Sequence, residues 1–286
     1  MYGLTFSKSP ASWRLVKQSG DKSEEVIFTM QGVIEGKNLP PVGDSLVSRI
    51  PNNKAHFMTQ SVTLSGLGTP TFEESLSALT EMYTVFCRQF PEGRVLPLPT
   101  AESCIGIGGS LTFSNRHFTK RAEGPHMKAV PFSSLVDPKK YLTRMLSSTL
   151  IHTEENEVQY FTRYSDMGQN YKYLPAGPQQ FRLGDIVEVQ FSMVVYQMRT
   201  QYYVVKPMLY SVALLDGKYA NELLMRATNV PVNPEPHKIL KRKIGYPVEE
   251  KDDIKRVKGS HGEGEGAEES EDSSVSGGLA KMSIDK

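Results

Sequence analysis

The sequence predicts an α+β protein of mainly antiparallel strands, a sandwich or partly open barrel with two or three packed helices and a disordered C-terminal tail. Three observations lead to this prediction. Apolar and polar residues alternate through 187–195, as in a strand with one buried face. Residues 71–90 repeat their apolar positions with a helical period instead. From about residue 248 onward, charge runs followed by Gly, Glu and Ser indicate disorder.

Composition divides the chain into three parts. Residues 1–230 are expected to form a single β-rich globular domain, followed by a proline-containing basic linker at 231–258 and an acidic Gly/Ser/Glu tail at 259–286. The whole chain holds 33 Lys plus Arg against 32 Asp plus Glu. This balance gives no overall field that would attract a nucleic acid or a membrane surface.

The first elements are two strands and a helix. Residues 26–34, interrupted by Gln31-Gly32, and residues 56–64 predict strands. A helix should then begin at Thr71 as the N-cap, with Glu74 at the capping-box position, and end before Pro91. Its buried face should hold Leu76, Leu79, Tyr83, Phe86 and Phe90.

A second helix should follow Asp137-Pro138, an acidic N-cap with proline at the first helical position. The segment between the two helices predicts mainly loops, including the GIGGS run at 106–110. Residues 158–164 predict another strand. The buried side of the second helix should consist of Tyr141, Leu142, Met145 and Leu146.

The clearest element is a strand pair. The strand at 187–195 turns at 197–201 into an aromatic and β-branched segment that ends at Asp216-Gly217. Because proline lacks the N–H that a ladder needs, Pro207 predicts a sheet edge or a bulge in the second strand. A short helix is expected at 221–226.

The chain lacks the common signatures of catalysis. Cys87 and Cys104 form no CxxC pair, the GIGGS run has neither the Lys-Ser/Thr of a P-loop nor the last glycine of GxGxxG, and no GxSxG is present. We therefore expect no cofactor. The absence of a signal peptide and of an apolar stretch long enough to span a membrane predicts an intracellular protein without membrane contact.

One histidine suggests a metal site. His152-Thr153-Glu154 has the H-x-E form of a two-histidine, one-carboxylate site, because residues i and i+2 of a strand point the same way. The third ligand would be His237, which lies in a proline-rich segment. With these three ligands the chain would be a metal-dependent oxygenase on a double-stranded β-helix. The alternative is a polar strand start without a metal.

The strand pair also suggests a contact surface. Aromatic residues on a sheet beside basic ones are how oligonucleotide-binding folds stack single-stranded bases. The alternative is that most of these aromatic residues belong to the core. The candidate contacts with a nucleic acid or a protein partner are Tyr196, Arg199, Tyr202, Tyr203 and Lys206.

Two basic clusters in the linker match a nuclear import signal, which must be exposed and flexible. Such clusters are also common in solvated linkers. The signal would consist of Lys241, Arg242, Lys243, Lys255, Arg256 and Lys258.

The segments FRLGDIVEVQFSMVV, SVALLDG and HKILKRKIGY, with IHTEENEVQYFTRY before them, carry a resemblance. They resemble a lineage-restricted family of uncharacterised proteins that mushroom-forming (basidiomycete) fungi encode in many copies. The similarity is closest over residues 137–246. It implies a fungal origin and one shared domain, and it brings no activity, cofactor or site residue. The sequence therefore favours a non-enzymatic binding or interaction protein, with single-stranded nucleic-acid binding and metal-dependent oxygenase activity as alternatives.

Overall fold

The computed structural model describes residues 2–20, 22–98, 100–102, 107–165 and 171–228. These residues belong to one unit of the chain. The predicted linker at 231–258 and tail at 259–286 lie outside the described residues. In the part that is described, no helix is both long and apolar enough to cross a membrane.

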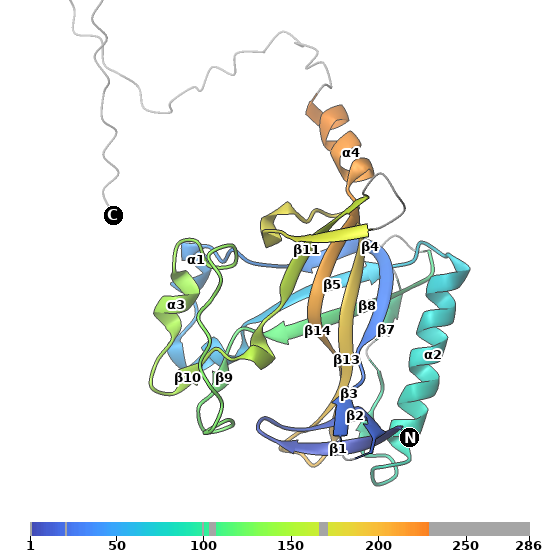
Figure 1. The fold of residues 1–286 in the computed structure, drawn as a ribbon, viewed down its shortest axis with the longest axis vertical. Helices are drawn as coiled ribbons and strands as arrows, with labels where there is room; N and C mark the ends of the chain where they lie inside the picture. Colours follow the sequence, from blue (N-terminus) through green and yellow to red (C-terminus); the bar gives the residue numbers. More distant parts are fainter. Residues whose placement is uncertain (1, 21, 99, 103–106, 166–170, 229–286) are drawn as a thin grey trace, which may run out of the picture. The chain divides into compact units, whose positions relative to one another are not determined.

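Twelve strands of the described residues form one mixed sheet, and two more form a short ladder (Figure 1). The sheet strands are β1 (Tyr2–Lys8), β2 (Ala11–Ser19), β3 (Lys22–Glu25), β4 (Phe28–Asn38), β5 (Thr59–Ser65), β6 (Val95–Leu96), β7 (Thr100–Glu102), β8 (Gly109–Arg116), β11 (Gln159–Ser165), β12 (Tyr171–Pro175), β13 (Ile186–Gln197) and β14 (Tyr203–Asp216). Their main order is β1-β2-β13-β4-β5-β8-β14-β11-β12, and β13 also pairs with β14. The separate ladder joins β9 (Thr119–Lys120) to β10 (Leu150–Ile151). The prediction of a mainly β-structured fold with few helices is confirmed.

The predicted strand pair is the centre of this sheet. β13 and β14 form a long antiparallel ladder, and β13 also pairs with β2 and β4. The predicted face of β13 is buried, but the opposite face is not exposed to solvent along its whole length, since Ser192 and Val194 are buried as well. The buried residues of the predicted face are Val187, Val189, Phe191, Met193 and Val195.

The expectation of a sheet edge at Pro207 is wrong. β14 has neighbours on both sides, with β13 on one and β6, β8 and β11 on the other. Pro207 lies between Val204, where the pairing with β6 ends, and Met208, which forms the one pair recorded with β8. The strand therefore accommodates a residue without an N–H inside the sheet, at a gap in its parallel pairings. The bulge lies nearby, where Tyr210 has no partner on β13.

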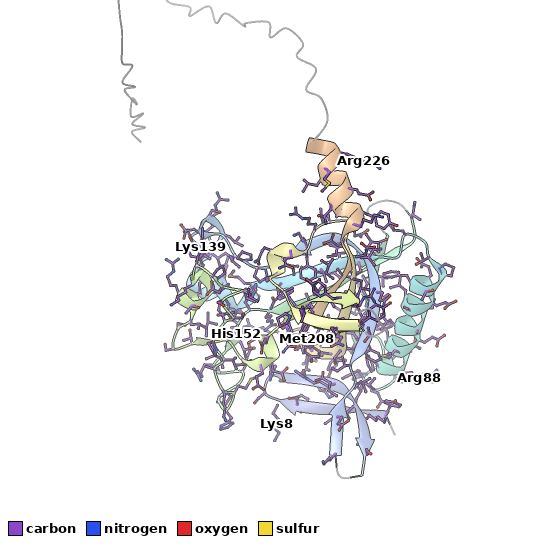
Figure 2. The ribbon with its side chains drawn as sticks, turned by 45° about the horizontal axis from the view of Figure 1, so that its top comes forward. Lys8, Arg88, Lys139, His152, Met208 and Arg226 are labelled. Carbon is purple, nitrogen blue, oxygen red and sulfur yellow. The ribbon has the colours of Figure 1, made fainter. Side chains whose placement is uncertain are left out.

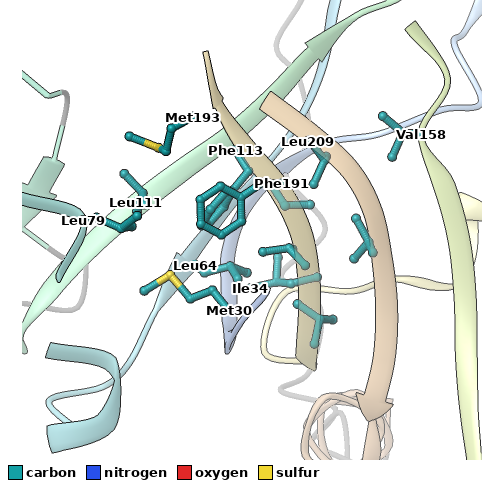
Figure 3. Packing of buried hydrophobic residues seen from close by; sticks show 14 of the residues in the cluster. Met30, Ile34, Leu64, Leu79, Leu111, Phe113, Val158, Phe191, Met193 and Leu209 are labelled. Atoms are coloured by element: carbon teal, nitrogen blue, oxygen red, sulfur yellow. The ribbon is translucent and has the colours of Figure 1, made fainter. Parts of the chain in front are cut away.

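One helix, α2 (Pro70–Cys87), contributes to the main core. It begins two residues before the predicted start, because Thr69 is the N-cap and Pro70 occupies the first helical position. The predicted capping by Thr71 is therefore wrong. Four residues of the predicted apolar face are confirmed: Leu76, Leu79 and Phe86 are buried, and Tyr83 packs partly buried against the core. The helix ends at Cys87, so Phe90 contacts the core from the segment after the helix and not from its face. Figure 3 shows Leu79 beside Leu111 of β8, and Phe113 and Phe191 belong to the same cluster.

Gly32 lies inside a strand. β4 continues through Gln31-Gly32, which in the sequence divides two apolar stretches. A Cβ at Gly32 would lie 3.0 Å from Cε2 of Phe72 and 3.1 Å from Cβ of Leu64. The glycine thus allows α2 and β5 to pack closely against β4.

A second, smaller core lies beside the main one. It is formed around α1 (Asp44–Val47), the 3₁₀-helix η1 (Asn52–Phe57) and α3 (Tyr141–Met145). Asp137 does act at the start of the predicted second helix, since its carboxylate accepts the backbone N–H groups of Leu142 and Thr143 at 3.1 and 2.8 Å. The helix itself begins later, at Tyr141. The buried residues of this core are Ala55, Met58, Phe118, Leu142, Met145 and Leu150.

Some elements differ from the sequence predictions. The strand expected over 56–64 is β5 at Thr59–Ser65, after η1. The final helix, α4 (Lys218–Thr228), is longer than expected. The strands that were not predicted are β1, β2, β3, β6, β7, β8, β9, β10 and β12. β1 and β3 bury no residue. In β2 and β8 the buried positions include polar residues, so the residue types show no clear apolar alternation; these residues are Ser12, Arg14, Ser110 and Asn115.

Candidate functional site

A cavity of about 300 Å³ lies next to β11. It is lined by the loop at 131–136, by residues 157–161 leading into and along β11, and by residues 175–176. Gln60 of β5 and His152, just after β10, complete the wall. The volume is at the lower end of the range of small-molecule pockets, roughly 300–1,000 Å³. These segments are far apart in the sequence, so only the fold brings them together.

The most distinctive group in the wall is the imidazole of His152 (labelled in Figure 2). It is buried, and its Nδ1 lies 2.9 Å from the backbone carbonyl oxygen of His117. Because a carbonyl oxygen only accepts, we assign the hydrogen to Nδ1. Burial lowers the pKa of His152, against the opposing effect of this hydrogen bond. The ring is therefore neutral at pH 7, and its Nε2 keeps a lone pair.

The ring of His152 is also fixed by stacking. Phe132, from the cavity loop, stacks on it with a centroid distance of 3.8 Å and an interplanar angle of 22°. The same loop is tied to this segment by the Val130 N–H, which donates to the carbonyl oxygen of His152 at 2.9 Å. The position of Nε2 is thus held by two contacts to the ring and one to the backbone.

A second polar group in the wall is a buried pair of side chains. The Tyr160 hydroxyl donates to Oε1 of Gln60 at 2.7 Å, and Nε2 of Gln60 donates to the carbonyl oxygen of Asn156 at 3.1 Å. Burial raises the pKa of Tyr160 well above its usual value, so the hydroxyl stays protonated and remains the donor. This pair largely satisfies itself. Besides His152, the other polar side chains of the wall are exposed, namely Ser133, Glu157 and Gln159. His152 therefore supplies a buried acceptor.

Buried hydrogen bonds stabilise the turn between His152 and β11. The turn contains the 3₁₀-helix η2 (Glu154–Asn156). Oδ1 of Asn156, the last residue of η2, accepts three hydrogen bonds. The donors are the Thr119 hydroxyl at 3.0 Å and the backbone N–H and hydroxyl of Thr153 at 3.2 and 3.1 Å. All three residues are buried. These hydrogen bonds fix His152 and the start of β11 relative to each other.

His117 lies behind His152. It is 2% exposed, and its Nδ1 has no hydrogen-bond partner among the described residues. Burial, together with the neighbouring His152, lowers the pKa of His117 to about 4, and the charge of Asp137 acts in the opposite direction. His117 is therefore a neutral residue at physiological pH that supports the cavity wall through its backbone carbonyl.

The cavity has little charge. Among the described residues that line it, Glu157 is the one charged side chain, and it is exposed to solvent. No lysine or arginine of the described chain belongs to this lining. An anionic group would therefore lose its hydration on entry and gain no cation in exchange.

The predicted metal ligands are placed differently from the expectation. His152 is buried after β10, whereas Glu154 is exposed at the start of η2, so the two do not share one strand face. Within the described ranges no group of three metal-ligating side chains comes together. His237 lies outside those ranges, so its convergence with His152 and Glu154 stays a prediction from the sequence.

The predicted contact residues of the strand pair divide into two sets. Tyr203 packs in the main core against Phe90 and Trp13, with centroid distances of 4.4 and 5.4 Å. Tyr196 is half-buried, and its hydroxyl donates to the sulfur of Met208 at 3.3 Å. Arg199, Tyr202 and Lys206 are exposed, and the guanidinium carbon of Arg94 lies 5.5 Å from the centroid of the Tyr202 ring.

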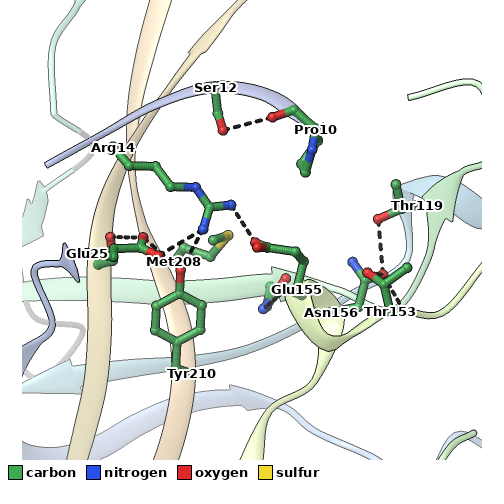
Figure 4. A network of polar contacts seen from close by, with 12 residues as sticks. Pro10, Ser12, Arg14, Glu25, Thr119, Thr153, Glu155, Asn156, Met208 and Tyr210 are labelled. Carbon is green, nitrogen blue, oxygen red and sulfur yellow. Dashed lines mark hydrogen bonds and ion pairs between the residues drawn. The ribbon is translucent and has the colours of Figure 1, made fainter. Parts of the chain in front are cut away.

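A cluster of polar contacts that the sequence did not predict joins side chains of β2, β3, η2 and the β13–β14 ladder (Figure 4). Arg14 donates to Glu25 at 2.9 Å and also pairs with Glu155. The Tyr210 hydroxyl donates to the same Glu25 at 2.9 Å, and Ser192 donates to it at 2.6 Å. The bulge at Tyr210 brings this side chain into the cluster. The two terminal nitrogens of Arg14 are paired in this cluster, whereas its Nε is buried without a partner among the described residues. Because the contacts join side chains from separate elements, we interpret the cluster as a link between β2, β3, η2 and the ladder.

The six basic residues of the predicted import signal lie outside the described residues. No protein-family model and no curated protein matches the chain.

Proposed function

We propose that this chain is a non-enzymatic binding protein and that the cavity beside β11 is its ligand site. The observation that carries the proposal is the neutral, fixed acceptor at Nε2 of His152 in the wall of a cavity of ligand size. Mostly apolar cavities with a few placed polar groups are the usual form of small-molecule sites.

The arrangement of the wall supports binding more than catalysis. The Tyr160 hydroxyl and the Gln60 amide donate hydrogen bonds to groups of the protein itself. His152 is held in one tautomer by the carbonyl of His117 and by stacking on Phe132. Such a rigid wall lowers the entropic cost of binding, because few groups must become ordered when the ligand enters.

A cavity-filling variant tests the proposal. Ala176 lines the cavity and is 6% exposed, so Ala176→Leu should occupy part of its volume. Ala220 is equally buried but does not line the cavity, which makes Ala220→Leu the matched control. The measurement is ligand-observed NMR of the full chain with a library of small neutral fragments, after denaturation curves confirm that both variants fold.

We expect a subset of fragments to bind the wild type and Ala220→Leu but not Ala176→Leu. A library that gives no binder, or binders that ignore Ala176→Leu, would contradict the proposal.

A second function, binding of single-stranded nucleic acid or of a protein partner by the strand pair, retains some support. Tyr202 is exposed beside Arg94, and Arg199 and Lys206 are exposed nearby in the sequence. If this surface binds nucleic acid, affinity for a labelled single strand should fall steeply with salt. The variant Tyr202→Ala should weaken it, since base stacking on an aromatic ring is lost. Weak binding that does not change with salt would exclude nucleic-acid binding by this surface.

We also propose that the main sheet forms a partly open barrel. The pairings β4–β5, β5–β8, β8–β14, β14–β13 and β13–β4 form a ring, and β8 and β14 share a single recorded pair. These pairings support a partly open barrel that is weakest between β8 and β14. Amide exchange should then be faster at this junction than in the β13–β14 ladder. Equal protection at both places would argue against it.

Two further proposals rest on the sequence alone. Nuclear import by the basic clusters at 241–243 and 255–258 predicts that a fluorescent fusion leaves the nucleus when their six basic residues become alanine. An unchanged distribution would refute it. Membership of the fungal family predicts that the segments at 181–195 and 211–217 recur together in many basidiomycete proteins, and their absence there would refute it.

A further inference from the structure

We infer that the cavity selects a neutral, planar ring compound with one hydroxyl or ring N–H donor, the class of phenols and indoles. This inference rests on the proposed binding function and adds the chemistry of the ligand. Four properties of the wall carry it: its size, its aromatic surface, the buried acceptor at His152 and its charge.

Size sets the upper limit. About 300 Å³ corresponds to roughly ten water molecules at about 30 Å³ each. A compound with one ring or two fused rings fits this space, whereas an extended peptide does not. The ligand is therefore a small molecule.

The aromatic surface favours a flat ligand. Phe132, Tyr160 and Phe161 line the cavity together with the ring of His152. Two of these rings, Phe132 and His152, are already stacked, and they form a rigid edge against which another ring can pack in an offset or edge-to-face geometry. Saturated rings of the same volume lack the flat π-surface that this contact requires.

The acceptor requires a donor on the ligand. Nδ1 of His152 is used by the carbonyl of His117, so the neutral ring offers the lone pair of Nε2. The Tyr160 hydroxyl is directed to Gln60 and is not a competing donor for His152. A ligand that brings an O–H or N–H satisfies the acceptor, whereas one without a donor leaves it unpaired and loses affinity.

Charge excludes the acidic relatives of these compounds. Of the described side chains in the lining, the one with a charge is Glu157, which is negative. A carboxylate or phosphate on the ligand would be repelled by Glu157 and would lose water without gaining a cation. Benzoate should therefore bind much more weakly than phenol, although the two are similar in shape.

The test compares matched probes by NMR titration of the full chain. Phenol has a hydroxyl donor that toluene lacks, and indole has an N–H donor that benzofuran lacks. Benzoate tests the effect of a negative charge. We expect the donor member of each pair to bind roughly three- to tenfold more tightly than its partner, the difference that one net hydrogen bond makes. Benzoate should not bind measurably at concentrations where phenol does.

Variants assign this preference to His152. In His152→Phe the ring remains and the acceptor is lost, so phenol and toluene should bind equally. His126 is exposed and does not line the cavity, and His126→Phe should keep the wild-type preference. If His152→Phe fails to fold, the two probe pairs on the wild type still decide the question.

The outcomes separate this inference from the proposed function. Equal binding of phenol and toluene to the wild type, or tight binding of benzoate, overturns the ligand class while other fragments can still occupy the cavity. A preference that persists in a folded His152→Phe also overturns it. Failure of every fragment and every probe to bind overturns the proposed function itself.

Discussion

Nδ1 of His152 donates to the backbone carbonyl oxygen of His117 across 2.9 Å. Two buried histidines are thereby joined, one in the cavity wall and one behind it. The contact leaves Nε2 as the nitrogen of His152 that can accept a hydrogen bond, and burial lowers the pKa of both residues. The stability of the protein and the chemistry of the cavity therefore depend on the same pair.

Acidification should destabilise the fold through His117. In the unfolded chain this residue takes up a proton near pH 6.5, whereas burial holds the pKa of the folded residue at about 4. Between these values the unfolded state binds more protons, so the free energy of unfolding falls as the pH falls, by about 3 kcal/mol, and levels off below pH 4. Above pH 6.5 this stability is fully present.

Urea denaturation at pH 7 and pH 4 measures the effect. The wild type should lose about 3 kcal/mol more than His117→Gln between the two pH values. His126→Gln, which changes an exposed histidine, should behave as the wild type. An equal loss in wild type and His117→Gln would show that His117 does not contribute.

Removing Arg14 should destabilise the link between β2, β3 and the ladder. Arg14→Met leaves Glu25 and Glu155 without their cation in a partly buried site, where their side chains are 24% and 31% exposed. We expect a loss of about 1–3 kcal/mol, below the cost for a fully buried pair because solvent screens these charges. Lys218→Met removes the exposed pair Lys218–Glu222 and should have little effect. Equal denaturation midpoints for the two variants would contradict this role.

A methyl group at Gly32 should disturb the main core. Its Cβ would lie within 3.1 Å of Phe72 and Leu64, and such overpacking costs about 1–3 kcal/mol. Gly3 is also a strand glycine, but a Cβ there meets nothing within 4 Å. In thermal denaturation, the midpoint of Gly32→Ala should be lower than that of the wild type, whereas the midpoint of Gly3→Ala should not be lowered. A stabilised Gly32→Ala would indicate that the glycine is not needed for packing.

Replacing two adjacent tyrosines of the strand pair should have different effects on stability, because Tyr203 packs against the core and Tyr202 is exposed. Tyr203 contacts Phe90 and Trp13, so Tyr203→Ala should cost about 2–4 kcal/mol as a partly buried aromatic residue. Tyr202 is 37% exposed, and Tyr202→Ala should change stability by about 0.5 kcal/mol or less. Chemical denaturation of the two variants checks this difference. A similar loss in both would mean that Tyr202 also belongs to the core.

The sequence was most informative where one segment carries its own pattern. The alternation around Val189 identified β13, and the helical period around Leu79 identified α2, because each turns a regularly spaced apolar face to the same core. β2 gave no such signal, since Arg14 is buried there by pairing with distant carboxylates. Pro207 was misjudged because a gap in the parallel pairings replaces the expected edge.

The cavity could not be predicted in the same way. His152 was recognised as a candidate, but for a metal site with Glu154, because the H-x-E spacing assumes a strand where the chain forms η2. Its actual partners, the His117 carbonyl and the Phe132 ring, are set by tertiary structure. No spacing in the sequence relates Gln60 to Tyr160, which are 100 residues apart.

The protonation state of His152 tests the central claim most directly. Long-range ¹H–¹⁵N correlation spectra of the histidine side chains distinguish the two neutral tautomers and the charged ring. At pH 7, His152 should appear as the neutral Nδ1–H tautomer, and the Nε2 signal should shift when phenol is added but not when toluene is. A charged ring, an Nε2–H tautomer, or an Nε2 signal indifferent to phenol would contradict the account.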